Sequence, residues 1–313
     1  HNKGLENLKK DNRISHWISV AFSVFERRKN MNYAVVGFGT AGYHAVKAIR
    51  TCDKEGEIDV YSNTSRAPYN PMLTTYYAFG KLEFDGLFPF GDLDQIRKEI
   101  SFHLIQEPVI RVHAKEHLVE TKQKTKQYDR ILIATGARAF APPVKGLDPE
   151  DAFLMRTVED SIRFKERLKQ KNVRHAVVIG ASMAGIKVVE VLHKFGIETW
   201  LLDLASYIFP LAAYKEVAKE IEKRVEAQGV HLMFGVTIDH MEQENGEKTA
   251  VLTDGSRIPA DIVGLCIGTR AITETVQGEV EIGRGIVVDD HMRTSVPGIY
   301  AAGDCCEGNN LES

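Results

Sequence analysis

The chain has 313 residues, of which 43% are hydrophobic and 27% charged, so it can form two globular domains and is not a disordered polypeptide. Its net charge of −3 gives no basic excess for nucleic acid or an anionic membrane, and we expect small molecules or another protein as partners. The four cysteines lack Cys-x-x-Cys and metal-ligand spacings, which predicts no metal site and a reduced, cytoplasmic protein.

Residues 1–30 are expected to form an N-terminal extension. The chain begins at His1, and Met31 stands directly before the first predicted strand, as an initiator would. The stretch 14–25 is apolar at most positions, but it is too short for a bilayer, which requires roughly 20 residues. We expect an amphipathic helix there, with a membrane-surface anchor as the alternative, and we predict no membrane span.

The first predicted strand, 34–36, runs into a glycine turn. Gly37, Gly39 and Gly42 have the Gly-x-Gly-x-x-Gly spacing that opens a helix after a buried parallel strand. The first glycine permits the tight turn, the second lets the backbone approach a pyrophosphate, and the third allows the helix and strand to pack closely. The N–H groups at such a helix start attract phosphate, although the same spacing also occurs in plain turns.

A second strand is predicted at 57–61, and its end departs from the usual pattern. An acidic residue normally follows this strand and accepts hydrogen bonds from a ribose, whereas this chain has Ser62 and Asn63. Their side-chain oxygens can accept from a hydroxyl without the strength of a carboxylate. We therefore expect looser, but not abolished, adenosine binding.

Residues 67–92 are rich in proline, glycine and aromatic residues, which predicts an ordered loop rather than a linker. Tyr69, Tyr76, Tyr77 and Phe79 could flank a flat ring, or they could fill the core. Short strands are expected between residues 102 and 118.

The opening pattern then repeats. After a buried strand in 128–136, a further strand leads into Gly180, Ser182 and Gly185 and another helix. The next strand, 198–202, ends at Asp203, a carboxylate that suits a ribose 2′-hydroxyl and repels a 2′-phosphate, which favours NADH over NADPH. Ser182 stands where the middle glycine is expected, and Lys187 puts a cation one turn into the helix.

The remaining pattern completes the second domain and returns to the first. A charged amphipathic helix is predicted at 215–228, and strands at 230–234, 250–252, 260–268 and 298–304. The last strand ends at Asp304, where hydroxyl or phosphate groups of a ligand gather in open α/β sheets.

The order of these motifs resembles the pyridine nucleotide-disulfide oxidoreductase superfamily over roughly residues 32–310. The motifs are VVGFGTAG, YDRILIATGA, VVIGASMAG, ADIVGLCIGTR and TSVPGIYAAGDC. The resemblance implies an α/β fold with two Rossmann-like nucleotide-binding domains, one inserted in the other. It assigns 31–148 and 271–313 to an FAD-binding domain and 149–270 to an NAD-binding domain.

The resemblance also implies which residues contact the cofactors. Val109 would meet the adenine through its backbone, and Asp304 would hold ribityl or phosphate groups. With Ser62 and Asn63, the candidates for FAD are Gly37, Gly39, Thr40, Ala41, Gly42, Val109, Ala134, Thr135, Gly136, Gly303 and Asp304. The candidates for NADH are Gly180, Ser182, Met183, Gly185, Asp203 and Gly268.

Departures from the family pattern indicate the branch. Family members that reduce disulfides need a reactive cysteine in the first domain, and the stretch PYNPMLTTYY has none, so the chain is more similar to the ferredoxin, rubredoxin and nitrite reductase relatives. The glutamate often found in the second helix is Lys187. We name Thr74, Tyr76 and Lys187 as candidate catalytic residues near the flavin or nicotinamide, and we expect Cys305 and Cys306 to be buried thiols beside the flavin.

The predicted function is an FAD-dependent oxidoreductase that passes hydride from NADH to flavin and electrons to a protein or small-molecule acceptor, with a homodimer as a possible assembly. The alternatives are a flavoprotein dehydrogenase or oxidase subunit and a non-catalytic nucleotide-binding fragment. Only nine residues follow Asp304, so we expect either a truncated chain or weak retention of FAD.

Overall fold

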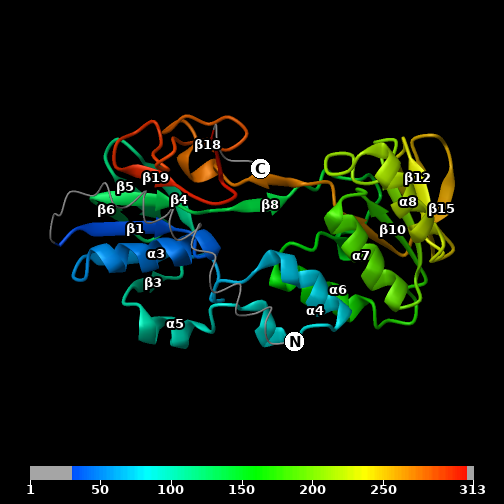
Figure 1. Ribbon diagram of the computed structural model, residues 1–313, viewed down its shortest axis with the longest axis horizontal. Helices are drawn as coiled ribbons and strands as arrows, with labels where there is room; N and C mark the ends of the chain where they lie inside the picture. Colours follow the sequence, from blue (N-terminus) through cyan, green and yellow to red (C-terminus); the bar gives the residue numbers. More distant parts are fainter. Residues whose placement is uncertain (1–29, 309–313) are drawn as a thin grey trace. The chain divides into compact units, whose positions relative to one another are not determined.

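The computed structural model describes residues 30–308, which Figure 1 draws in colour along the chain. The predicted extension lies outside these residues except for Asn30, and so do residues 309–313. The chain divides into two compact units. Of the described residues, the first contains 30–69, Phe88–Arg138 and 270–308, and the second contains Asn70–Leu87 and Ala139–Thr269.

The first unit is built on a parallel five-stranded sheet in the order β19-β7-β1-β2-β3. Its strands are β1 (Asn32–Val36), β2 (Glu57–Tyr61), β3 (His103–Ile105), β7 (Arg130–Ile133) and β19 (Ile299–Ala301). Val36 pairs with Tyr61 on one side and with Ile133 on the other, so these strands end at one level. The residues that follow them therefore meet at the same edge of the sheet.

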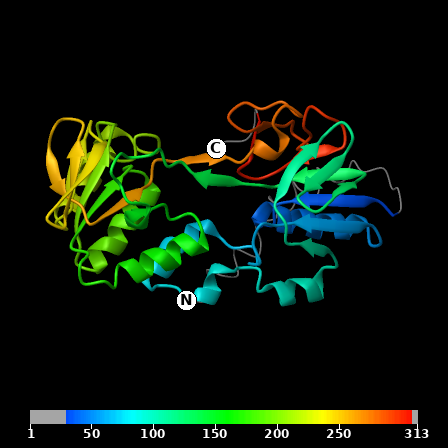
Figure 2. The same cartoon turned by 180° about the vertical axis from the view of Figure 1, so that it is seen from behind.

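Apolar residues cover both faces of this sheet, as a parallel sheet requires. On one face Val35 and Val60 pack with α3 (Thr40–Cys52) and α5 (Leu93–Glu99). On the other face Val36 and Ile131 pack with an antiparallel sheet of β4 (Val109–His113), β5 (Leu118–Thr121) and β6 (Thr125–Gln127). Figure 1 and Figure 2 show α3 and the β4–β6 sheet on opposite faces of the parallel sheet.

The second unit repeats this architecture with a parallel sheet in the order β12-β11-β10-β16-β9. Its strands are β9 (Ala152–Phe153), β10 (His175–Ile179), β11 (Glu198–Asp203), β12 (His231–Phe234) and β16 (Ile262–Leu265). Ile179 pairs with both Leu202 and Leu265, so these three strands also end together.

The two faces of the second sheet are covered in the same way. Val178 and Leu201 pack with the helices α6 (Val158–Arg167), α7 (Met183–Lys194) and α8 (Lys215–Glu226). Val177 and Leu202 pack with an antiparallel sheet of β13 (Ile238–Glu244), β14 (Glu247–Leu252) and β15 (Arg257–Pro259). The predicted fold class, α/β with two Rossmann-like domains, is confirmed.

The segment predicted as an ordered loop contains a helix, α4 (Thr74–Phe79). Asn70 caps the turn before it through its side chain, Pro71 stands at the first position of that turn, and Gly80 ends α4 in the left-handed conformation. α4 packs against α6 and α7, which explains why residues 70–87 group with the second unit and not with the first half of the chain.

Candidate functional site

The glycine turn of the first unit is forced by close backbone contacts. Gly37 has a φ of 107°, and its N–H donates to the carbonyl of Tyr61 over 2.9 Å. A Cβ atom on Gly37 would overlap the carbonyl oxygen of Ala134, and one on Gly42 would overlap that of Gly37. Gly39 differs, because a Cβ there would meet nothing within 4 Å. The turn therefore leaves open space at Gly39, where α3 begins.

The other predicted residues of the first unit lie at the start of α3 and after the carboxyl ends of β7 and β19, at the same edge of the sheet. Thr40 and Ala41 form the first turn of α3, and a Cβ on Gly303 would lie 2.9 Å from the Cβ of Ala41, so the end of β19 approaches the start of α3. Ala134 is buried and Thr135 half-buried, and the Thr135 hydroxyl donates to the Ile272 carbonyl over 2.6 Å. The other residues here are Gly136, whose φ is 70°, and the exposed Asp304.

Ser62 follows β2, but its hydroxyl is already engaged. It donates to the Thr64 carbonyl over 2.9 Å and accepts from the Thr64 N–H over 3.3 Å, and the residue is 6% exposed. Asn63 is exposed, and Val109 is half-buried at the start of β4. Of the predicted neutral pair, only Asn63 thus presents its side chain to solvent.

The second unit repeats the turn with one difference. Gly180 has a φ of 105°, and Cβ atoms on Gly180 and Gly185 would overlap the carbonyl oxygens of Cys266 and Gly180. Ser182 is the N-cap of α7: its hydroxyl donates to the Cys266 carbonyl over 3.1 Å and accepts from the Gly185 N–H over 3.4 Å. The Ser182 side chain therefore caps one backbone N–H group at the start of α7, whereas Gly39 has no side chain that could cap the start of α3. Met183, the next residue, is exposed.

Asp203 ends β11 beside this turn. Its Oδ2 accepts from the Ala181 N–H over 2.7 Å and its Oδ1 from the Ala205 N–H over 2.8 Å. A carboxylate has about four acceptor positions, so two hydrogen bonds leave capacity for a ligand hydroxyl. Gly268, with a φ of 103°, lies past the end of β16, and a Cβ there would meet nothing within 4 Å. The residues predicted for the second nucleotide therefore share one edge of the second sheet.

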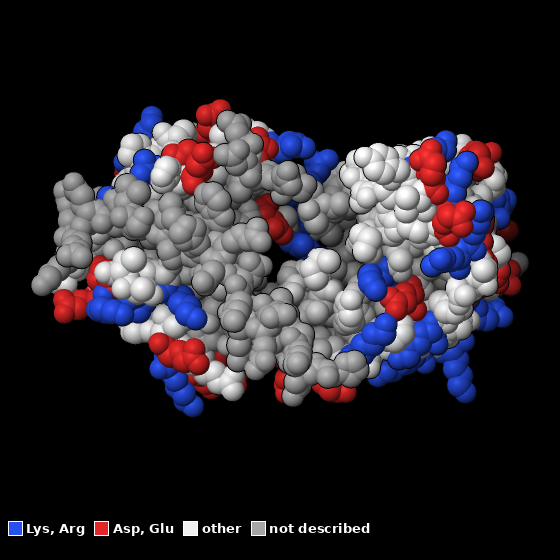
Figure 3. All heavy atoms as spheres, viewed as in Figure 1, with Lys and Arg blue, Asp and Glu red and all other residues white. Residues whose placement is uncertain are grey.

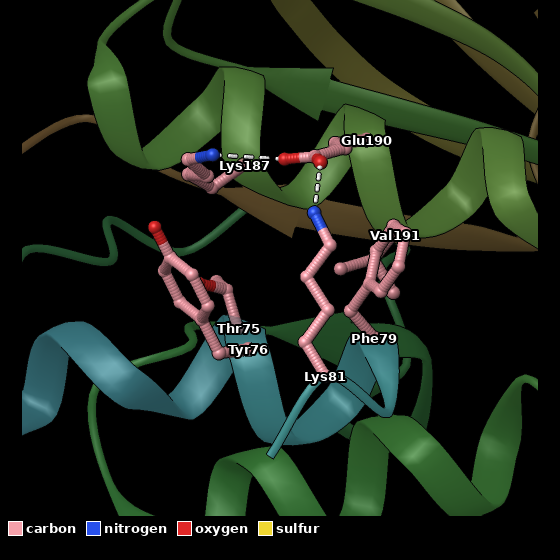
Figure 4. A pocket seen from close by; sticks show the side chains of 7 residues that line it. All are labelled: Thr75, Tyr76, Phe79, Lys81, Lys187, Glu190 and Val191. Carbon is pink, nitrogen blue, oxygen red and sulfur yellow. Dashed lines mark hydrogen bonds and ion pairs between the residues drawn. The ribbon is translucent and has the colours of Figure 1, made fainter. Parts of the chain in front are cut away.

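A pocket between α4 and α7 contains two of the three candidate catalytic residues. The side chains that line it are those of Thr75, Tyr76, Phe79, Lys81, Lys187, Glu190 and Val191. Figure 4 shows Lys187 and Lys81 converging on Glu190. Lys187 Nζ lies 2.9 Å from Glu190 Oε2, Lys81 Nζ lies 2.7 Å from Glu190 Oε1, and Lys187 Nζ is 5.4 Å from the centre of the Tyr76 ring.

The charges in this pocket reinforce one another. The hydrogen bonds from Lys81 and Lys187 lower the pKa of Glu190, and the hydrogen bond to Glu190 raises the pKa of Lys187. Lys187 is therefore an ammonium group at neutral pH, held in place three residues from its partner on the same helix. It can orient or attract an anion, but it does not have the lowered pKa of a general base.

Thr74, the third candidate, does not line this pocket. It is 1% exposed, and its hydroxyl donates to the Pro71 carbonyl over 2.8 Å, with the Met155 carbonyl 3.3 Å away. The hydroxyl thus anchors the start of α4. This environment gives Thr74 a structural role, and its predicted catalytic role stays a prediction.

Aromatic residues of segment 70–87 also contact lysines of the second unit. Lys165 lies 3.9 Å from the centre of the Tyr77 ring, and Lys194 lies 4.4 Å from the Phe79 ring and donates to the Phe79 carbonyl. On the face drawn in Figure 3, lysine and arginine side chains gather where α4, α6 and α7 lie. Cation–π contacts of this kind hold the segment on the second unit.

Cys305 and Cys306 lie at the edge of the first sheet, directly after Asp304. Cys305 is fully buried and Cys306 half-buried, and both are free thiols. A hydrogen bond from Cys306 lowers the pKa of Cys305 to about 7, with further help from the Gly136 and Thr135 amides. The Cys306 pKa is raised by the same hydrogen bond.

Three charged residues near these sites, Lys81, Glu107 and Glu190, belong to no sequence motif. Lys81 and Glu190 were not singled out because their pairing joins segments more than one hundred residues apart in the chain. Glu107, two residues past β3, has a buried carboxylate oxygen, Oε2, with no hydrogen-bond partner. Its position after a strand of the nucleotide fold was the one signal that could have indicated it.

The fold defines a protein with two Rossmann-like units of the doubly wound α/β class. Comparisons with known proteins then give the family. Residues 31–313 match the family described as pyridine nucleotide-disulphide oxidoreductase. The chain is 31% identical over 294 residues to monodehydroascorbate reductase of Solanum lycopersicum, covering 88% of this chain and 68% of that protein. The chain therefore belongs to this family, as the motifs predicted.

Other relatives indicate the branch. NADH oxidase of Methanocaldococcus jannaschii is 27% identical over 285 residues, which cover 88% of this chain and 63% of that protein. The putidaredoxin reductase–putidaredoxin complex matches with a TM-score of 0.81 and 25% identity over 90% of this chain and 69% of that chain. Rubredoxin and nitrite reductases are also similar, as predicted. The chain spans about two thirds of the length of these relatives, and one third of the nitrite reductase subunit.

Members of this family bind FAD and NAD(P)H, and the two edges fit these groups. In the first unit, the open space at Gly39 and Gly136 admits a pyrophosphate close to the backbone. In the second unit, Asp203 provides a carboxylate at the strand end, and Gly268 leaves open space. Within residues 30–308, no three or more metal-ligating side chains come together as a group. The helices of this part of the chain also lack the combination of length and hydrophobicity that a membrane-spanning segment needs.

Proposed function

We propose that this chain is an FAD-dependent oxidoreductase that takes hydride from NADH and passes electrons to a protein or small-molecule acceptor. The observation that carries the proposal is the duplicated turn: Gly37 and Gly180 make the same contacts at the edges of two parallel sheets. Family membership supports flavin and nicotinamide chemistry as the reaction class.

In this proposal the first unit holds FAD. The N–H groups at the start of α3 would face its pyrophosphate across Gly39, and the turn formed by Ala134, Thr135 and Gly136 would close over it. Asp304 would hold ribityl or phosphate groups, and Val109 would meet the adenine through its backbone. When bound, FAD supplies the hydride acceptor and the electron store.

The second unit would hold NADH. The start of α7 faces the pyrophosphate, and Asp203 accepts from a ribose 2′-hydroxyl while repelling a 2′-phosphate. This charge supports NADH over NADPH. Lys187, which carries its positive charge at neutral pH, would orient the nicotinamide half or an anionic acceptor, and Tyr76 would flank it. The protein's contribution is then orientation and electrostatics, not proton transfer.

The electron acceptor is proposed only as a class. Relatives are named for nitrite, rubredoxin, monodehydroascorbate and NADH oxidation, and one related structure is a complex with putidaredoxin. The proposed electron acceptor is therefore either a small molecule or a redox protein. A homodimer and a cytoplasmic location, the latter based on the cysteine content, are also proposals.

A second function is favoured by one specific observation. Ser182 occupies the Gly185 amide that a pyrophosphate would otherwise use, and a relative is named as subunit epsilon of an NADH-dependent phenylglyoxylate dehydrogenase, 26% identical over 276 residues. The chain could thus be the flavoprotein subunit of a larger dehydrogenase, in which the second site binds an adenine nucleotide without turnover.

One anaerobic titration tests the proposal. The purified full chain is loaded with FAD, and the flavin absorbance is followed as NADH is added without oxygen. Stoichiometric bleaching by NADH, with NADPH far slower, is the expected result. Bound flavin that NADH does not reduce would favour the subunit function, and a chain that binds no flavin would refute the main proposal.

A further inference from the structure

The first unit lacks a carboxylate at the position where the second unit has one. The Gly37 N–H donates to the Tyr61 carbonyl over 2.9 Å, and the Gly180 N–H donates to the Leu202 carbonyl over 2.8 Å. The residue after Tyr61 is Ser62 and the residue after Leu202 is Asp203, so these two occupy equivalent places. A ribose in the first unit therefore has no acidic partner at the end of β2.

Ser62 does not replace that carboxylate well. Its only hydroxyl proton is donated to the Thr64 carbonyl, and one of its lone pairs accepts from the Thr64 N–H. The side chain is neutral and almost fully buried. A hydrogen bond from a ligand hydroxyl to it would lack the strength of a charge-assisted bond.

Glu107 brings a carboxylate to the same edge from the neighbouring strand. The Ser62 N–H donates to the Ile105 carbonyl over 3.0 Å, which joins the ends of β2 and β3. The Glu107 N–H donates to the same carbonyl over 2.9 Å, so the chain turns directly after β3. Burial raises the pKa of Tyr61 and the negative charge of Glu107 adds to this rise, in keeping with a carboxylate close to the end of β2.

The side chain of Glu107 is unusual because its Oε2 is buried and makes no hydrogen bond within the described residues. A buried acceptor without a donor costs free energy, and the cost is larger for a charged group. Such an orphaned oxygen is therefore explained most simply by a donor that a ligand brings.

We propose that Glu107 accepts hydrogen bonds from the ribose hydroxyls in the adenosine half of FAD, in place of the carboxylate that β2 lacks. The inference rests on the proposed function, because it takes FAD as the ligand of the first unit. A ribose carries two neighbouring hydroxyl donors, which match a carboxylate, whereas a phosphate would be repelled by it.

The test compares FAD with FMN, which lacks the adenosine half. Flavin is removed from the full chain, and each flavin is added back while its fluorescence is recorded. Glu107→Gln keeps the shape of the side chain and removes its charge, so FAD binding should weaken by about tenfold to one hundredfold while FMN binding stays unchanged. Glu116→Gln, an exposed site on the turn between β4 and β5, is the matched control and should change neither.

Two further measurements separate binding from folding. Because Glu107→Gln removes an unpaired buried charge, the flavin-free variant should unfold at the same temperature as the wild type or at a higher one. Adding Ser62→Asp to Glu107→Gln returns a carboxylate to the end of β2 and should restore part of the lost FAD affinity.

The outcomes are distinct. Wild-type affinity for FAD in Glu107→Gln, or an equal loss of FAD and FMN binding, would overturn the role of Glu107 and leave the proposed function standing. A wild-type chain that shows no saturable binding of FAD would overturn both.

Discussion

Asp203 accepts a hydrogen bond from the backbone N–H of Ala181, with 2.7 Å between Oδ2 and the amide nitrogen. Ala181 follows Gly180 in the second glycine turn, so the carboxylate at the end of β11 ties the strand to the turn. The Asp203 side chain therefore shapes the turn and keeps acceptor positions for a further donor.

Asp203→Asn is expected to weaken NADH binding by about tenfold, because the amide group offers one accepting oxygen where the carboxylate offers two. The preference for NADH over NADPH should fall as well, since the charge that repels a 2′-phosphate is gone. Fluorescence titration with both nucleotides measures the effect. Asp254→Asn, where an exposed aspartate caps the Ser256 N–H over 2.9 Å, is the control, and an equal loss in both variants would contradict the prediction.

Gly42→Ala should lower the stability of the fold, whereas Gly39→Ala should mainly lower FAD binding. The new Cβ at residue 42 would overlap the Gly37 carbonyl oxygen, and we expect a loss of roughly 1 to 3 kcal/mol in the free energy of unfolding. At residue 39, whose φ is −86°, the Cβ meets nothing within 4 Å, so stability should change by only a few tenths of a kcal/mol while FAD binding falls. Urea unfolding and flavin content are measured together. Normal flavin content in Gly39→Ala would show that the pyrophosphate does not approach there.

Glu190→Gln tests the ion pairs that Glu190 on α7 makes with Lys187 on the same helix and with Lys81 after α4. The lysines lower the pKa of Glu190 below its usual 4.5, so its contribution to stability is present at neutral pH and is lost as the pH falls through the lowered value. Each pair is partly exposed, so we expect less than about 1 kcal/mol per pair. Thermal unfolding from pH 7 to pH 3 should show the variant less stable at pH 7 and equal to the wild type at the acid end. A difference that does not shrink with acid would exclude this origin.

Cys306→Ala should raise the pKa of Cys305, because the thiol of Cys306 is the main hydrogen-bond donor that lowers it to about 7. Thiolate absorbance at 240 nm, recorded against pH in a Cys52→Ser background, follows this titration without the exposed thiol. Cys266 does not interfere, since burial raises its pKa to about 12. An unchanged midpoint after Cys306→Ala would assign the effect to the neighbouring amides instead.

Local sequence was sufficient for the elements that repeat. The strand at Glu57–Tyr61 was predicted with its observed bounds, and both glycine turns were located, because a steric requirement for glycine is visible at each position. The helix α4 was missed. Its residues are aromatic and β-branched, and packing against α6 and α7 decides their conformation.

The predicted site residues fall into two groups, those whose geometry the motif spacing indicates and those whose environment depends on tertiary contacts. Gly37 and Gly180 follow from backbone geometry that the spacing of the motif encodes. For Thr74, the sequence did not reveal that the residue is buried and that its hydroxyl donates to the Pro71 carbonyl. Its catalytic role stays a prediction. Lys187 departs from the family pattern in the sequence, and its partner Glu190 lies three residues further along the same helix. The contact of Lys81 with Glu190 joins segments 109 residues apart and became visible only in the tertiary structure.

The sequence alone determined that this protein carries two glycine turns, each between a strand and a helix, and an acidic residue after the second, since the spacing of the glycines and the position of Asp203 are read directly from the chain. The tertiary structure decided which side chains from distant parts of the chain lie near the carboxyl ends of the strands in each parallel sheet. Glu107 stands beside Ser62 because β3 pairs with β2, and residues 70–87 group with the second unit because α4 packs on its helices. Contacts between distant segments depend on how the chain folds back on itself, and motif spacing does not encode that.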